Sequence, residues 1–337
     1  MKPRPLAILQ VADQGPLESL LPMLNQASYE CALPNDSLVD ELKRIGCDTV
    51  LTPRQLHQDM GYDWPSIGLT ASPSAMENAE LYVDVKAHRN GPKVVEKWPN
   101  LKGKVLWYRI NGGEPEHVVK GDVDHGDEIN PGCPILTPNA WYRGRDDSYV
   151  MWPAFARKND YKRISSDGPP VCLIHSLHGW GHRDIAEHLQ GEVKMYGVRS
   201  PDGLIPHSKV PELLGNALAM VHLKSNDCPG YALYEAIYSR CPVIISRNLI
   251  WRMNQSDLWQ EGATCLCFDE SGHQGRTAKE TRFCVAEIKD HLAKLRRNPV
   301  LGTMIAKCAF DRLERMAWDE REDGLHFKAW MEKVFPR

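Results

Sequence analysis

The sequence predicts an α/β protein made of two successive domains of similar size, each with a parallel sheet. Short apolar segments alternate with segments of helical periodicity in both halves of the chain, which is typical of parallel strands joined by helices. A polar stretch over 156–170 ends in Gly-Pro-Pro and interrupts the alternation once, as a linker or hinge does. The 337 residues are enough for two hydrophobic cores.

The first predicted domain spans residues 1–155. An amphipathic helix over 17–27 follows its first strand. The strand-like segments are 5–12, 80–87, 104–110, 133–140 and 148–155. Strands separated by helical patterns imply a parallel sheet with covering helices.

The second predicted domain spans residues 171–315, and the alternation restarts there. Its strand-like segments are 171–177, 192–198, 218–223, 242–246 and 264–268, and its helical segments are 185–190, 210–217 and 231–240. The final segment, 316–337, contains one amphipathic helix over 318–335.

Composition is that of an ordinary globular protein, with 42% apolar and 25% charged residues. The first residues lack the layout of a signal peptide, and no apolar run approaches the roughly 20 residues that span a bilayer. We therefore expect a cytoplasmic protein. The net charge is −3, and residues 1–155 hold 15 Lys and Arg against 21 Asp and Glu. This balance is not typical of a polyanion-binding protein.

The ten cysteines are scattered through the chain. They form no CxxC motif and no paired spacing suited to zinc. We expect them to be reduced and mostly buried.

Two acids and a glycine stand between a predicted strand and a predicted helix. Asp227 and Gly230 lie in the loop, and Glu235 lies one turn into the helix. Ligands bind at the carboxyl ends of strands in open parallel sheets, where a glycine lets backbone amides approach them. Two carboxylates there are suited to accept hydrogen bonds from the hydroxyl groups of a ribose and a sugar. The alternative is a helix cap at Asp227 and a solvated acid at Glu235.

The segment NDCPGYALYEAIYSRCPVIIS, residues 226–246, resembles the E-x7-E signature of retaining, nucleotide-sugar-dependent glycosyltransferases of the GT-B fold. It is most similar to the family 4-like group, whose pattern is E-G-F-G-x-x-x-x-E-A-M-A-x-G-x-P-V-V. Residues 210–223, 261–268 and 316–320 resemble, in the same order, further segments of that family. The resemblance is good over 171–270 and collinear over 1–155. It implies two Rossmann-like domains facing a cleft, with a C-terminal helix that crosses back to the N-terminal domain.

The resemblance also implies roles for the motif residues. Glu235 matches the acid that holds the ribose hydroxyls of the nucleotide. Asp227 matches the acid that contacts the transferred sugar, where the family usually has a glutamate, so this arm is one methylene shorter. Gly230 and Tyr231 complete the expected donor-binding residues of this segment.

The family places an arginine and a lysine, five residues apart, after the first strand of this domain. Here Arg183 takes the second place and the first falls on His178. A departing diphosphate needs positive charge or amide donors, so a His178 protonated by the phosphates is the expected substitute. The alternative is that Arg183 is a solvated residue at the start of a helix.

In the first domain, Gly15 follows the first strand and could offer its amide to a phosphate or an acceptor, although a plain turn is the alternative. His88 ends a segment that resembles the family's D-V-x-x-x-H strand end. Where the family has a second histidine that contacts the sugar, this chain has Asn111, with Arg109 nearby. The identity of the sugar therefore does not follow from the resemblance.

Two patterns suggest a metal site. Asp122 and Asp124 form a DxD motif of the kind that binds a divalent cation in the other large glycosyltransferase fold, but they lie in a Gly- and Asp-rich loop of a two-domain chain. His175, His178 and His182 are spaced in a way that no regular face holds together. We therefore expect no metal ligands.

An aromatic and basic segment precedes the linker. Trp141, Tyr142 and Arg143 could stack on a base and hold phosphates, contact a sugar acceptor, or belong to core and surface. We treat them as candidate acceptor contacts.

The resemblance implies transfer of a sugar from a nucleotide sugar, most commonly a UDP-sugar, to an acceptor hydroxyl with retention of configuration and with no metal or other cofactor. The acceptor is a saccharide or small molecule, or a hydroxymethylated DNA base as in bacteriophage DNA modification. Because Asp227, His178 and Asn111 depart from the pattern, a catalytically silent nucleotide-sugar-binding protein is the alternative. No pattern indicates an oligomeric state.

Overall fold

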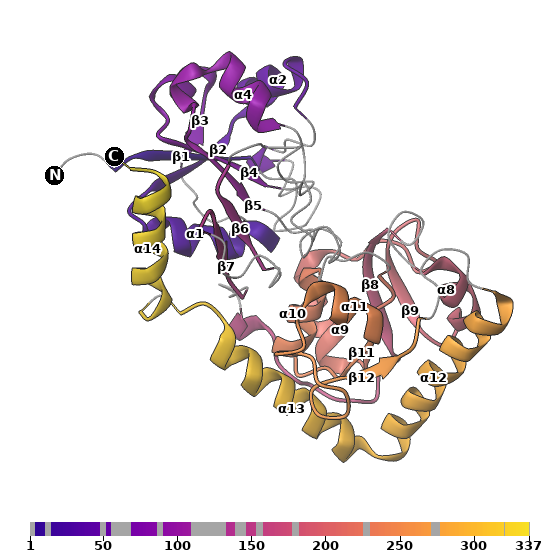
Figure 1. Cartoon of the computed structure of the whole chain (residues 1–337). Coiled ribbons are helices and arrows are strands. Elements are labelled where there is room, and N and C mark those ends of the chain that lie inside the picture. Colours follow the sequence, from indigo (N-terminus) through magenta and orange to yellow (C-terminus); the bar gives the residue numbers. More distant parts are fainter. Residues whose placement is uncertain are drawn as a thin grey trace. The chain divides into compact units, whose positions relative to one another are not determined.

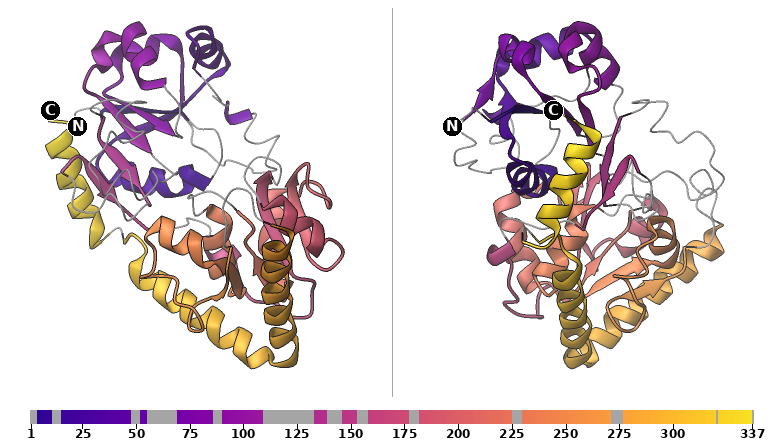
Figure 2. Two further views of the ribbon diagram at one scale, coloured as in Figure 1. Left: turned by 45° about the vertical axis from the view of Figure 1, so that its right-hand side comes forward. Right: turned by 60° about the vertical axis from the view of Figure 1, so that its left-hand side comes forward.

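The chain folds into two compact units, each built around one parallel sheet (Figures 1 and 2). Unit 1 comprises residues 1–156 and 317–337, and unit 2 comprises residues 157–316. The predicted α/β class is confirmed, and the domain boundaries drawn from the sequence stay a prediction. The computed structural model describes residues 4–10, 15–47, 52–54, 69–85, 90–108, 133–138, 146–152, 158–176, 182–224, 230–270, 277–319 and 321–336.

The sheet of unit 1 has the order β3-β2-β1-β4-β5-β6-β7, and its neighbours all pair in parallel. Its strands are β1 (Leu6–Gln10), β2 (Glu30–Pro34), β3 (Thr70–Ala71), β4 (Leu81–Val85), β5 (Val105–Tyr108), β6 (Ile135–Thr137) and β7 (Ser148–Val150). Its described helices are α1 (Gly15–Gln26), α2 (Asp36–Arg44), η1 (Pro73–Asn78), α4 (Asn90–Lys97), η2 (Pro99–Leu101) and α14 (Asp323–Val334). The strand order reverses between β1 and β4, so the carboxyl ends of these two strands form the switch point of this sheet.

The C-terminal helix α14 belongs to unit 1 and packs against α1. Gly324 makes this close approach possible, because a Cβ there would lie 2.8 Å from Cγ of Gln26. Tyr149 of β7 also contacts α14, with its ring centroid 5.2 Å from that of Phe327 and 5.5 Å from that of Trp330. The helix predicted over 318–335 starts later than expected, at Asp323.

The sheet of unit 2 has the order β12-β11-β10-β8-β9 and is also parallel throughout. Its strands are β8 (Val171–Ser176), β9 (Lys194–Val198), β10 (Met220–Val221), β11 (Val243–Ser246) and β12 (Leu266–Phe268). Its described helices are η4 (Lys158–Asp160), α8 (Arg183–Leu189), η5 (His207–Lys209), α9 (Val210–Asn216), α10 (Tyr231–Tyr238), α11 (Arg247–Met253), α12 (Ala278–Arg297) and α13 (Pro299–Met316). The order reverses between β8 and β10, which makes their carboxyl ends the switch point of this sheet.

The reversal of strand order determines on which face of the sheet each helix of unit 2 lies. Right-handed crossovers place α8 on one face and α9 and α10 on the other, because the chain moves in opposite directions across the sheet before and after β9. Consistent with this, α8 packs against α12, and α9 packs against α10. One apolar core joins α8 and α12 to the inner strands, with Ile185, Leu189, Ile288 and Leu292 fully buried.

The predicted linker is described from residue 158 and is bonded along α9. The amide of Ile164 donates to the carbonyl of Gly215 at 2.8 Å, and the amide of Gly168 donates to the carbonyl of Asn216 at 3.0 Å. Gly215 allows this contact, since a Cβ there would lie 2.5 Å from the carbonyl oxygen of Lys162. Residues 158–170 are thus tied to unit 2, and their role as a hinge stays a prediction.

Gly197 fixes how closely β9 approaches β8. Its φ is +149°, and a Cβ on it would lie 1.8 Å from the carbonyl oxygen of Ile174. The register between the two strands shifts in the same region, between Leu173 and Ser176. A glycine is therefore required for β8 to reach the switch point in its observed path.

We predict that Gly197→Ala lowers the free energy of unfolding of unit 2 by about 2–5 kcal/mol, because the new methyl group meets a strand carbonyl and the backbone is strained as well. Gly203→Ala is the matched control, since its φ is +77° but nothing lies within 4 Å of a Cβ there. The control should cost only about 1–2 kcal/mol. Amide hydrogen exchange measured on peptides of unit 2 gives both values, and equal costs would contradict the proposed steric role.

Candidate functional site

The carboxyl ends of β8 and β10 bring together the starts of α8 and α10. Gly230 is the N-cap of α10 and adopts φ +65°, a conformation that other residues rarely take. Tyr231 is the first residue of the helix, and its side chain is half-buried. The predicted strand before the motif and the predicted helix after it are thus present, with the first amides of α10 at the switch point.

Glu235 lies one turn into α10, as the spacing predicted, and is 6% exposed. Its Oε1 accepts two hydrogen bonds, from the Tyr161 hydroxyl at 2.9 Å and from His207 Nε2 at 2.6 Å. Within the described residues, Oε2 makes no hydrogen bond. Glu235 is therefore not the solvated acid of the alternative interpretation. It is a held carboxylate with one oxygen available to a ligand.

Arg183 is the first residue of α8, where the sequence placed a helix start. Its side chain is 64% exposed, and Nε donates to Oε1 of Glu187 at 2.9 Å. A cation at the amino end of a helix has the unfavourable sign for the helix dipole, and the ion pair with Glu187 offsets this. A diphosphate would have to compete with Glu187 for this arginine.

Lys224 and His222 follow β10 and were not singled out from the sequence. The Lys224 ammonium nitrogen and His222 Nε2 each lie 3.8 Å from the point where a Cβ of Gly230 would stand. His222 is 3% exposed, and its Nδ1 accepts a bond from the Lys224 amide at 3.3 Å. The sequence offers one signal for these two residues, which is a lysine shortly after a strand. This pattern is too common in sequences to indicate a site.

A buried ionic cluster lies near the carboxyl edge of this sheet, and the sequence analysis did not predict it. Glu270, two residues after β12, is fully buried and its Oε2 lies 2.6 Å from His182 Nε2. Arg252 of α11 pairs with the other oxygen of Glu270. Burial raises the pKa of Glu270, but the hydrogen bonds from His182 and Ser246 and the charge of Arg252 outweigh it, so the pKa lies below its ordinary value.

This cluster anchors the start of α8. The His182 amide donates to the carbonyl of Leu223 at 2.8 Å, so the residue before α8 is bonded to the segment after β10. Its ring is bonded to the end of β12 through Glu270. His182 therefore has a structural position at the sheet edge, and the metal cluster that a histidine-rich segment suggests is not needed to explain it.

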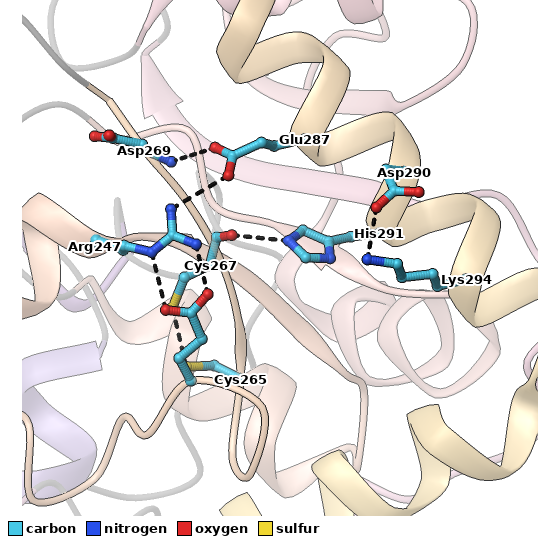
Figure 3. Close-up of polar contacts among 9 residues, drawn as sticks. Arg247, Cys265, Cys267, Asp269, Glu287, Asp290, His291 and Lys294 are labelled. Atoms are coloured by element: carbon cyan, nitrogen blue, oxygen red, sulfur yellow. Dashed lines mark hydrogen bonds and ion pairs between the residues drawn. The ribbon is translucent and has the colours of Figure 1, made fainter.

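A second ionic network surrounds the end of β11 (Figure 3). Arg247 donates from Nε to Glu261 at 2.9 Å and from Nη1 to Glu287 of α12 at 3.4 Å. The hydrogen bonds that Arg247 donates to Glu261 raise the pKa of Arg247 above its ordinary value. Glu287 also accepts from the Asp269 amide at 2.7 Å, and His291 Nε2 lies 2.8 Å from the Cys267 carbonyl. The network ties α12 to β12.

The switch point of unit 1 carries polar groups that are fully buried. Gly15 is the first residue of α1, which begins two residues before the helix predicted over 17–27. Gln10 at the end of β1 accepts a hydrogen bond from the Tyr82 hydroxyl and stands in register with Asp84 of β4. Burial, and then the neighbouring Asp84, raises the pKa of Tyr82 well above its ordinary value. Asn90 Nδ2 lies 3.5 Å from Asp84 Oδ1.

The remaining predicted site residues lie outside the described residues. They are His178, Asp227, His88, Arg109, Asn111, Trp141, Tyr142 and Arg143. Asp122 and Asp124 lie outside them as well. Over the described ranges, no group of three or more His, Cys, Asp or Glu side chains could hold a metal ion. No helix in the described part of the chain is long and apolar enough to cross a bilayer.

No family model and no curated protein matches the sequence. Solved structures do match. HepE of Anabaena, solved in complex with UDP and glucose, is 12% identical over 98% of this chain and 99% of its own, with a TM-score of 0.57. Sucrose-phosphate synthase of Thermosynechococcus elongatus is 13% identical over the same shares, with a TM-score of 0.59. A glycosyltransferase of Rickettsia africae is 11% identical over 99% of both chains, with a TM-score of 0.52. The predicted GT-B fold is confirmed by these likenesses.

We predict that Glu270→Gln destabilises unit 2 by about 3–5 kcal/mol at neutral pH, because it leaves Arg252 without its buried counter-ion. The folded pKa of Glu270 lies below the unfolded value of about 4.3. Its stabilisation is therefore complete above that pH and is lost as the pH falls through the folded pKa. The variant should lack this part of the acid dependence.

Hydrogen exchange of unit 2 as a function of pH measures both effects. Glu187→Gln is the control, because the Arg183–Glu187 pair is exposed and should be worth less than about 1 kcal/mol. An unchanged acid slope in Glu270→Gln would contradict the assignment of that slope to this carboxylate.

Proposed function

We propose that this chain is a glycosyltransferase that moves a sugar from a nucleotide sugar to an acceptor hydroxyl with retention of configuration. The observation that carries the proposal is Glu235: a buried carboxylate one turn into α10, beside the switch point of a GT-B sheet, with one oxygen available to a ligand. The carboxyl ends of β8 and β10 are where an open parallel sheet binds nucleotides.

The ribose of the donor is bound by Glu235 in this proposal. Tyr161 and His207 hold Oε1 and fix the rotamer, and Oε2 accepts from a ribose hydroxyl. The bare Cα of Gly230 leaves room for the phosphates beside the first amides of α10. UDP is the first nucleotide to test, since HepE was solved with UDP and glucose.

The chemical step is a same-face displacement at the anomeric carbon. The acceptor oxygen bonds to that carbon, the bond from the carbon to the phosphate oxygen breaks, and its electron pair leaves on the diphosphate. The leaving diphosphate takes the proton of the acceptor hydroxyl, so no protein nucleophile is required. The protein contributes alignment of the two substrates and charge stabilisation of the leaving group.

The acceptor is a saccharide or small molecule in the first form of the proposal and a hydroxymethylated DNA base in the second. A screen of labelled nucleotide sugars against glycans and modified DNA separates the two. Release of free UDP from a UDP-sugar in the absence of acceptor supports an enzyme. Tight binding of UDP-sugars with neither hydrolysis nor transfer would favour the silent binding protein instead.

We predict that Glu235→Ala weakens binding of UDP and of uridine to the same extent, by about 1–3 kcal/mol, because both ligands carry the ribose whose hydroxyl loses its acceptor. Isothermal titration measures both affinities. Glu212→Ala is the control, since Glu212 is exposed on the neighbouring helix α9. Unchanged affinity for every nucleoside and nucleotide would remove Glu235 from the site.

We further predict that sugar transfer, or UDP release without acceptor, persists in an excess of EDTA. In the proposed mechanism, protein cations and helix amides carry the diphosphate charge, whereas a DxD site at Asp122 and Asp124 would need a divalent cation. Loss of turnover in EDTA that manganese restores would support the DxD site and contradict the proposed mechanism.

A further inference from the structure

Lys224 stands where the phosphates of a donor would lie. It is the third residue after β10, and its ammonium nitrogen is 3.8 Å from the vacant Cβ position of Gly230. His222 Nε2 lies at the same distance from this point. Among the described residues, a cation and an imidazole thus lie beside this left-handed glycine.

No carboxylate among the described residues pairs with Lys224. Its side chain is half-buried, and within the described residues its ammonium makes no ion pair or hydrogen bond. Other cations of this sheet edge are already paired: Arg183 with Glu187, Lys209 with Glu212, Arg247 with Glu261 and Glu287, and Arg252 with Glu270. Arg199, which also makes no ion pair in the described part of the chain, is exposed beyond the edge strand β9.

The surroundings of Lys224 make an anion the matching ligand. A partly desolvated ammonium without a counter-ion is unfavourable, and here it also faces the amino end of α10, which carries partial positive charge. A dianionic group placed between Lys224 and the first amides of α10 would remove both costs.

We propose that Lys224 is the cation that binds the diphosphate of the nucleotide sugar and stabilises it as it leaves. This inference rests on the proposed function and assigns to Lys224 the charge that the sequence resemblance assigned to Arg183 and His178. Negative charge on the diphosphate grows as the bond to the anomeric carbon breaks, so a fixed cation stabilises the transition state more than the bound donor.

The first test is binding of UDP against binding of uridine. Lys224→Met should lower the affinity for UDP about 10- to 100-fold and leave that for uridine unchanged, because only UDP carries the charged group. Lys224→Arg should keep most of the UDP affinity. Lys294→Met, which removes an exposed lysine paired with Asp290 on its own helix, is the control and should bind both ligands as the unchanged chain does.

The uridine measurement also reports folding, since a misfolded Lys224→Met would lose both ligands. In that case Lys224→Gln and Lys224→Arg take its place, and a loss of uridine binding in all three would overturn the proposal in favour of a structural lysine. Equal UDP affinity in Lys224→Met and the unchanged chain would overturn it too. So would a UDP-specific loss in Arg183→Met or Arg199→Met that Lys224→Met does not show.

The second test is turnover, which distinguishes this inference from the proposed function. Lys224→Met should lower kcat about 10²–10³-fold, with a smaller effect on the KM for the donor. If the unchanged chain binds no nucleoside diphosphate among UDP, GDP, ADP, CDP and TDP, the proposed function itself fails. If it binds UDP and transfers sugar while Lys224→Met has normal kcat, only the role of Lys224 is overturned.

Discussion

The site in unit 2 depends on one constraint. Two parallel strands can be joined only by a crossover that brings the chain back to the edge of the sheet where the first strand began. Every helix of the unit that follows a strand therefore starts at the carboxyl edge of the sheet. The order reverses only once, so β8 and β10 become neighbours while their following helices, α8 and α10, leave on opposite faces. The residues that could contact a ligand lie at this point, namely Glu235, Gly230, His222 and Lys224.

The switch point is held in place by interactions that do not face a ligand. Glu270, His182 and Arg252 come from three segments that are distant in sequence, and their buried contacts fix the ends of β12, α8 and α11 together. A buried charge that loses one partner is strongly destabilising, which makes such a cluster intolerant of rearrangement. Gly197 supports the site sterically and not through charge, because only a residue without a Cβ lets β9 lie this close to β8. A site of this kind gains precision from its rigid support.

Much of this arrangement could be predicted from local patterns. The strand-like segments around 171–177 and 242–246 correspond to β8 and β11, since apolar runs of that length between turn signals have few other structures available. The position of Glu235 one turn into α10 followed from its distance to Gly230. What could not be predicted is which side chains meet. His182 and Glu270 are 88 residues apart, and their contact depends on strand order, which periodicity does not encode. The contact of Tyr161 with Glu235 depends in the same way on the path of residues 158–170 along α9, and the contact of His207 depends on the position of η5.

The pairing of the cations separates structural from chemical roles at this edge. An arginine that is already bonded to a carboxylate, as Arg247 is to Glu261 and Glu287, must break those bonds before it can bind a phosphate, and the lost ion pairs reduce what the phosphate gains. Its geometry is also fixed by those partners. A half-buried lysine with no partner in the described residues has the opposite properties, because it is costly in the absence of an anion and needs no rearrangement when one arrives. The sequence resemblance chose its cation by position in a motif, which led to Arg183. The structure directs attention to a cation that no described carboxylate pairs with, which is Lys224 beside Gly230.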